Sequence, residues 1–171
     1  MRNIEIGIVG LGYVGLPLAI ELCKKYKVIG FDLNKNRTQE LKTCFDSTNE
    51  VSEKNLKAAL PRISFVHEPS YIKNCNIYIV TVPTPVDKNN NPNLEPLISA
   101  TKLIGTLLTS NNIVVYESTV YPGCTENVCV PLLEKYSGLN YNKGFFVGYS
   151  PERINPGDKK NNLKNITKIV S

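Results

Sequence analysis

Three glycines at positions 10, 12 and 15 form the spacing Gly-x-Gly-x-x-Gly, which indicates binding of a dinucleotide pyrophosphate. The first glycine permits a tight turn, and the second has no side chain to keep phosphates away from the backbone. The third lets a helix pack closely on the preceding strand, and the N-terminus of that helix offers free N–H groups to an anion. We therefore predict that Gly10, Gly12 and Gly15 hold dinucleotide phosphates.

An acidic residue, Asp32, ends the apolar stretch 27–32 and follows the glycines at about the distance expected for a ribose-binding carboxylate. It would accept hydrogen bonds from both ribose hydroxyls and would repel a 2′-phosphate, which favours NAD over NADP. The alternative is a glycine turn that serves packing only. The apolar run before the glycines, the helical pattern after them and the acidic residue together favour the dinucleotide interpretation.

Other polar side chains also follow predicted strands, and each has a structural alternative. Arg37 could meet a phosphate or stack on adenine, or it could be a solvated arginine in the first turn of a helix. Thr84, which prolines flank, could donate to the cofactor or lie in a rigid loop without contact. Ser118 and Thr119 carry hydroxyls on the ligand side, where Thr119 could bind cofactor, order a water or cap a turn.

A carboxylate, a guanidinium and an amide crowd together in the loop 150–158, at Glu152, Arg153 and Asn155. A reactive site needs such groups, whereas an isolated Glu–Arg pair is more often a solvated salt bridge. All of these candidate residues follow strand ends. Because the carboxyl ends of parallel strands share one edge of a sheet, we expect the candidates to converge there.

Apolar runs and helical periodicity alternate about six times along the chain. We expect strands near 4–9, 27–32, 63–66, 76–82, 112–116 and 144–149, and helices near 13–26, 34–43, 53–60, 95–108 and 125–136. This alternation predicts an α/β fold with a doubly wound, mainly parallel, Rossmann-like sheet flanked by helices and joined by right-handed crossovers.

Composition narrows the function classes. A chain of 171 residues fits one domain, 1–171, and contains no apolar run of membrane-spanning length or signal peptide. The net charge of +5 comes from scattered lysines and arginines, which gives no support for nucleic-acid binding. Five cysteines without a Cys-x-x-Cys pair suit a reducing cytoplasm, and a single histidine argues against a zinc site or a Ser-His-Asp triad.

These residues carry a family resemblance. The chain resembles the N-terminal NAD-binding domain of the UDP-glucose/GDP-mannose dehydrogenase family through four stretches: Gly10–Pro17, Val82–Pro85, Glu117–Val120 with the following Pro122 and Gly123, and Ser150–Glu152. The stretch Tyr149–Asp158 is similar to the branch that acts on UDP-N-acetylhexosamines. Pro156 stands where the UDP-glucose branch usually carries a second glutamate.

The resemblance implies a four-electron oxidation in which a sugar's primary alcohol passes through an aldehyde to a carboxylate and two NAD are reduced. It assigns NAD contacts to Tyr13, Val14, Asp32, Arg37, Thr84 and Thr119. It makes Glu152 a general base for the water that hydrolyses the enzyme-bound intermediate. Thr119 would help to hold that water, and Arg153 and Asn155 would face the UDP-sugar.

In this family the nucleophilic cysteine and most of the nucleotide-sugar site lie in later domains, and dimerisation uses a long central helix. None of the five cysteines here lies in the nucleophile motif, and the run 168–171 looks like the start of another strand. We therefore expect a fragment of a homo-oligomeric enzyme, which binds NAD without turning over substrate. A UDP-glucose or hydroxy-acid dehydrogenase, or a stand-alone NAD(H)-sensing module, are the alternatives.

Overall fold

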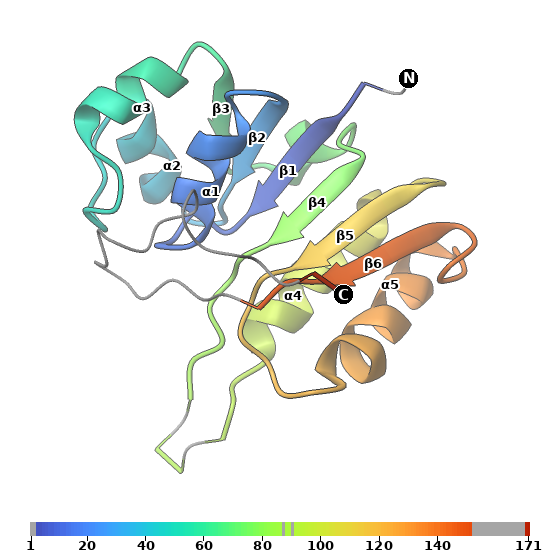
Figure 1. The fold of residues 1–171 in the computed structure, drawn as a ribbon. Helices are drawn as coiled ribbons and strands as arrows, with labels where there is room; N and C mark the ends of the chain where they lie inside the picture. Colours follow the sequence, from blue (N-terminus) through green and yellow to red (C-terminus); the bar gives the residue numbers. More distant parts are fainter. Residues whose placement is uncertain (1–2, 87, 90, 152–169) are drawn as a thin grey trace.

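The computed structural model describes residues 3–86, 88–89, 91–151 and 170–171. Its strands form one sheet in the order β3-β2-β1-β4-β5-β6, and every pairing between these named strands is parallel (Figure 1). The strands are β1 (Glu5–Val9), β2 (Lys27–Phe31), β3 (Ile63–Val66), β4 (Ile77–Val80), β5 (Asn112–Tyr116) and β6 (Phe145–Tyr149). The strand order reverses direction between β1 and β4, and such a switch point is where open α/β sheets bind their ligands.

Helices cover both faces of this sheet (Figure 1), which confirms the doubly wound α/β architecture predicted from the sequence. One side carries α1 (Gly15–Leu22), α2 (Lys35–Lys42) and α3 (Glu53–Ala59). The other side carries α4 (Glu95–Leu107), α5 (Val130–Ser137) and the single 3₁₀ turn η1 (Pro69–Ile72).

Two apolar cores lie on the opposite faces of the sheet, because side chains alternate along each strand. In β1, Ile6 and Ile8 belong to the core under α1 and α3, whereas Val9 belongs to the core under α4 and α5. The central strands are therefore buried on both sides. This double burial explains why they are nearly continuous apolar runs in the sequence.

Two predicted helices have different bounds in the structure. The helix expected over 13–26 covers only Gly15–Leu22, because residues before Gly15 belong to the glycine turn. The helix expected over 125–136 begins with a π-helical turn, η2 (Thr125–Cys129), before α5. Pro131 at the start of α5 has no N–H for the α-helical bond to residue 127, and the wider turn accommodates this.

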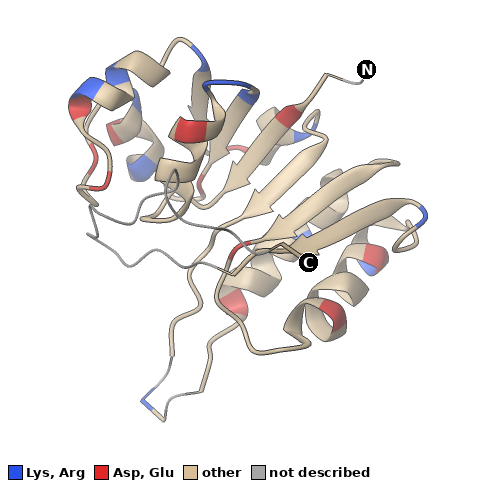
Figure 2. Ribbon diagram, in the orientation of Figure 1, with Lys and Arg blue, Asp and Glu red and all other residues tan. Residues whose placement is uncertain are grey.

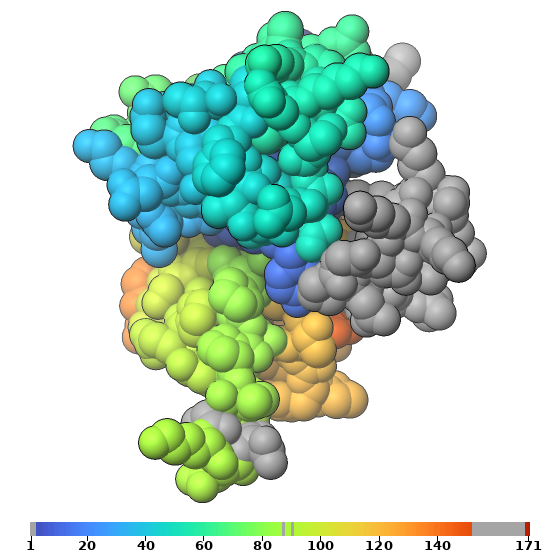
Figure 3. Space-filling view, turned by 90° about the vertical axis from the view of Figure 1, so that its left-hand side faces the viewer, coloured from blue at the N-terminus to red at the C-terminus, as the bar shows by residue number. Residues whose placement is uncertain are grey.

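The surface carries mixed charge. Figure 2 shows lysine and arginine positions spread among aspartate and glutamate positions over the helices and loops of the described chain. The stretch between β4 and α4 projects from the body of the fold (Figures 1 and 3), with Val86 and Pro92 bridging its two arms. Within the part of the chain that the structure describes, no helix is long and apolar enough to span a bilayer.

Candidate functional site

The glycine turn between β1 and α1 has a geometry that only glycine fits at two of its three positions. Gly10 has a φ of +98°, in the region that side chains disfavour. A Cβ on Gly15 would lie 1.9 Å from the carbonyl oxygen of Gly10, so any side chain there would collide with the turn. A Cβ on Gly12 would have no protein atom within 4 Å, so this side of the turn is open to a ligand. The roles predicted for Gly10 and Gly15 in backbone geometry are confirmed.

Thr81, directly after β4, anchors the turn and was not recognised from the sequence. Its buried hydroxyl lies 2.7 Å from the carbonyl oxygen of Gly10 and 3.1 Å from that of Val9, which are 71 and 72 residues away in the sequence. The same hydroxyl would be 2.4 Å from a Cβ on Gly15. One side chain thus fixes both the turn and the approach of helix α1. In the sequence, a threonine at the end of a predicted strand was the signal for this role, and such a threonine is too common to indicate it.

Replacing Thr81 by valine keeps the shape of the side chain but removes both hydrogen bonds. We expect the free energy of unfolding to fall by about 1–2 kcal/mol and NAD affinity to fall with it, because the turn loses its anchor. Urea denaturation and calorimetric titration measure the two effects. Thr101→Val is the matched control, since Thr101 is equally buried but bonds the hydroxyl of Tyr116 away from the turn. Thr101→Val should lower the free energy of unfolding but leave NAD affinity unchanged. An unchanged NAD affinity in Thr81→Val would contradict the anchoring role.

The N-terminus of helix α1 faces the open side of the turn and is suited to an anion. Its N-cap, Val14, provides no side-chain hydrogen bond, and the first turn contains no acidic residue. The N–H of Leu16 donates to the carbonyl oxygen of Gly12 (3.1 Å) and Pro17 has no N–H, so this terminus attracts an anion mainly through the positive end of the helix dipole, which no acidic side chain of the first turn neutralises. Tyr13 is 46% exposed beside this terminus and Val14 is half-buried, so both are accessible to a bound ligand.

Asp32 lies against the glycine turn, as its position after β2 predicted. The N–H of Leu11 donates to its Oδ2 (N···O 2.8 Å), and the N–H of Asn34 donates to its Oδ1 (2.8 Å). The carboxylate therefore stands beside the glycine turn, at the place predicted for a ribose.

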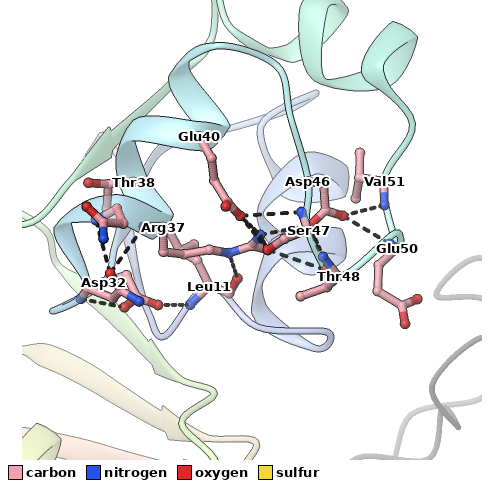
Figure 4. A network of polar contacts seen from close by, with 12 residues as sticks. Leu11, Asp32, Arg37, Thr38, Glu40, Asp46, Ser47, Thr48, Glu50 and Val51 are labelled. Carbon is pink, nitrogen blue, oxygen red and sulfur yellow. Dashed lines mark hydrogen bonds and ion pairs between the residues drawn. The ribbon is translucent and has the colours of Figure 1, made fainter.

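Arg37 lies in the first turn of α2, as the alternative considered from the sequence had it, but it is buried, so its expected solvation is wrong. Its Nε donates to the carbonyl oxygen of Leu11 (2.8 Å), and its Nη1 forms ion pairs with Glu40 and with Asp46 (2.8 Å) (Figure 4). Leu11 is thus held through its N–H by Asp32 and through its carbonyl by Arg37. The predicted contact of Arg37 with NAD stays a prediction.

A second group of predicted residues joins the loops that follow β4 and β5. The hydroxyl of Thr84 donates to the carbonyl oxygen of Thr119 (2.5 Å), and the hydroxyl of Ser118 donates to that of Val82 (2.6 Å). Ser118 is buried, so its hydroxyl stabilises the loops. Thr119 is exposed, so its hydroxyl is the accessible member of the group.

Glu152, Arg153 and Asn155 lie outside the described residues, so their predicted roles stay predictions. The described chain leads to them through Ser150, whose N–H extends the sheet by donating to the carbonyl oxygen of Tyr116 (2.9 Å). The hydroxyl of Ser150 is buried without a hydrogen-bond partner, and such groups are rare enough in folded proteins to mark it as a residue of interest. Ser171, the last residue of the sequence, exchanges two backbone hydrogen bonds with Tyr149.

The cysteines of this chain are structural. All five are buried free thiols, as the sequence suggested for Cys23 and Cys75. Burial raises the pKa of Cys75 to about 12 and that of Cys129 to about 11, so neither provides a thiolate near neutral pH. Among the described residues, no three histidine, cysteine, aspartate or glutamate side chains gather as a metal site.

Comparison with known proteins identifies the family to which this site belongs. The model of the NAD-binding domain of the UDP-glucose/GDP-mannose dehydrogenase family matches residues 4–171. The chain belongs to the UDP-glucose/GDP-mannose dehydrogenase family. Membership confirms the resemblance inferred from the sequence, and it confirms NAD as the cofactor of this domain.

Two relatives are similar over nearly the whole chain. The chain is 53% identical over 171 residues to a UDP-N-acetyl-D-glucosamine 6-dehydrogenase of Pseudomonas aeruginosa, covering 100% of this chain and 40% of the relative. It is 55% identical over 169 residues to the protein of the same name from Salmonella typhi, covering 99% of this chain and 40% of the relative. The chain thus spans about two fifths of the length of these relatives.

A solved structure agrees with the fold. An NDP-N-acetyl-D-galactosaminuronic acid dehydrogenase from Methanosarcina mazei superposes with a TM-score of 0.89 at 26% identity, covering 99% of this chain and 38% of that one. The fold of this chain is therefore shared with that dehydrogenase over nearly the whole length of the chain.

Proposed function

We propose that this chain provides the NAD site of a nucleotide-sugar 6-dehydrogenase that oxidises the primary alcohol of a UDP-N-acetylhexosamine to the uronic acid. The open side of the glycine turn carries the proposal: Gly12 is unobstructed, the terminus of α1 is uncapped and Asp32 stands beside both. These groups fit a pyrophosphate joined to a ribose. The names of the two relatives and the stretch Tyr149–Asp158 support an N-acetylated sugar.

Each part of the site has a distinct task in this proposal. Gly12 and the N–H groups at the start of α1 receive the pyrophosphate, and Asp32 accepts the adenosine ribose hydroxyls. Bound NAD supplies the acceptor for the hydrides removed from the sugar alcohol and then from the aldehyde stage. Thr119 positions water, and Glu152 takes a proton from it. Ser118 and Thr84 tie together the loops that present Thr119.

The nucleophilic cysteine and most of the sugar site would belong to the portion of the relatives that this chain does not span. We therefore propose that the 171-residue chain binds NAD but does not oxidise a UDP-sugar by itself. A longer form of this protein that includes its own equivalent of that portion, assayed by NADH formation, tests the substrate. UDP-N-acetylglucosamine should be oxidised faster than UDP-glucose. The opposite preference would place the protein in the UDP-glucose branch.

Calorimetric titration of the chain with NAD and NADP tests the cofactor site. Hydrogen bonds to a charged group are worth about 1.5–3 kcal/mol, so Asp32→Ala should weaken NAD binding by roughly tenfold or more. The preference of the wild type for NAD over NADP should largely disappear through this loss. Glu53→Ala, which removes an exposed carboxylate on α3 paired with Lys57, is the control and should leave both affinities unchanged. Equal NAD affinity in the wild type and in Asp32→Ala would contradict the role assigned to Asp32.

A further inference from the structure

Each nitrogen of the Arg37 guanidinium has a hydrogen-bond partner within the protein (Figure 4). Its Nε is 2.8 Å from the carbonyl oxygen of Leu11, and its Nη1 contacts Glu40 and lies 2.8 Å from Oδ1 of Asp46. Its Nη2 lies 3.4 Å from the hydroxyl of Thr48. Only 8% of the residue's surface is exposed. The positive charge of Arg37, next to the proposed ribose-binding end of the turn, is therefore held by groups of the protein itself.

The position of this arginine matters for the choice between NAD and NADP. In dinucleotide-binding folds an acidic residue after the second strand binds the ribose 2′-hydroxyl, and an arginine nearby accommodates the 2′-phosphate of NADP. Both residue types are present here on the two sides of Leu11, with Asp32 on its N–H and Arg37 on its carbonyl. The chain thus contains Arg37, the cation that NADP binding would use, but pairs it with Glu40 and Asp46.

The carboxylates that pair with Arg37 are themselves fixed. Asp46 accepts hydrogen bonds from the backbone N–H groups of Thr48 (3.0 Å), Glu50 (3.0 Å) and Val51 (2.9 Å), so it cannot follow the arginine elsewhere. Glu40, one turn along α2, accepts from the hydroxyl of Ser47 (2.8 Å) and is the more accessible partner, with 22% of its side chain exposed. Two carboxylates on one guanidinium leave a net negative charge there.

We propose that Glu40 and Asp46 determine cofactor specificity by holding Arg37 on Leu11 and away from the position of a 2′-phosphate. They are positioning residues, which act through Arg37 rather than by touching the cofactor. The site then excludes NADP twice: Asp32 repels the extra phosphate, and the arginine is held on Leu11 with its positive charge offset by two carboxylates. Removing Asp32 alone is therefore insufficient to create NADP binding.

The test compares 5′-ADP with 2′,5′-ADP, which differ only in the 2′-phosphate, by calorimetric titration of the chain. The variants are Asp32→Ala alone, Asp32→Ala with Glu40→Gln, and Asp32→Ala with Glu53→Gln. The last is the matched control, because Glu53 lies on α3, is exposed and pairs with Lys57, yet its replacement changes net charge equally. Asp46 is left in place because it also holds the backbone of residues 48–51.

Glu40→Gln in the Asp32→Ala background should strengthen 2′,5′-ADP binding about tenfold and leave 5′-ADP binding within twofold, since one charge-assisted hydrogen bond becomes available. Glu53→Gln in the same background should leave the affinity for both ligands unchanged. A further Arg37→Gln replacement should remove the gain. The inference is overturned if Glu40→Gln gives no selective gain, or if the Glu53→Gln control gives the same gain through net charge alone.

The inference rests on the proposed ribose site at Asp32, and wild-type titrations separate the two. Failure of the wild type to bind 5′-ADP would overturn both, because no adenosine site would exist. Binding of 5′-ADP that weakens in Asp32→Ala, together with no selective effect of Glu40→Gln, would keep the ribose site and reject the specificity role. If the variant with Arg37→Gln does not fold, as judged by circular dichroism, the comparison of Glu40→Gln with Glu53→Gln still decides.

Discussion

Gly15→Ala is expected to lower the free energy of unfolding by about 3 kcal/mol and to abolish NAD binding. The added Cβ would lie 1.9 Å from the carbonyl oxygen of Gly10 and 2.4 Å from the hydroxyl of Thr81, and real Cβ atoms essentially never approach within 3.0 Å. Helix α1 would have to move away from the turn, which separates its N–H groups from the phosphate position. In a protein of this size the melting temperature should fall by roughly 6–12 °C.

Gly12→Ala is the matched control, with the same chemical change three residues away. A Cβ on Gly12 would meet no atom within 4 Å, so stability should stay within about 0.5 kcal/mol of wild type. NAD affinity should nevertheless fall at least tenfold, because the methyl group projects into the space proposed for the pyrophosphate. Thermal unfolding and NAD titration of both variants separate packing from binding. A wild-type melting temperature for Gly15→Ala would contradict the close approach of helix and turn.

Asp46→Ala is expected to be the second severe change, with a loss of about 3–5 kcal/mol in the free energy of unfolding. The side chains of Asp46 and Arg37 are 1% and 9% exposed, so removing the carboxylate leaves a buried guanidinium with half of its pairing gone. Three backbone N–H groups in residues 48–51 lose their acceptor as well. Urea denaturation at neutral pH measures the loss. Glu53→Ala removes a carboxylate from an exposed pair and should cost under about 0.5 kcal/mol.

The contribution of Asp46 should depend on pH in one direction. Burial by itself raises the pKa of this carboxyl, but the hydrogen bonds from Thr48, Val51 and Arg37 outweigh burial and lower the pKa below its usual value. A group whose pKa is lower in the folded state stabilises above the unfolded-state pKa and loses that effect as pH falls through the folded pKa. The stability difference between wild type and Asp46→Ala should be constant near neutral pH and shrink below about pH 4. A difference that grows in acid would contradict the pKa assignment.

Local sequence patterns predicted most of the secondary structure. Strands β3 and β5 begin and end at the residues expected, because each is a short run rich in β-branched and aromatic residues that polar or turn-forming residues bound on both sides. The alternation of strands and helices was sufficient for the parallel, doubly wound architecture, since short crossovers leave few other arrangements. The π-turn before α5 was not predicted from the sequence. The apolar pattern repeats about every 3.6 residues across both segments, and one wider turn caused by Pro131 does not change that pattern visibly.

The candidate site divides in the same way. The backbone tasks of Gly10 and Gly15 and the placement of Asp32 beside the turn follow from spacing along the chain, and the sequence alone determined them. Only the tertiary structure decided that Thr81 holds Gly10 and that Asp46 holds Arg37. Backbone conformation and burial pattern depend on neighbours in the chain, whereas the partner of a buried hydroxyl or guanidinium depends on which segments folding brings together. That is why Arg37 could be located on α2 from the sequence, while the carboxylates that hold its charge became evident only in the folded chain.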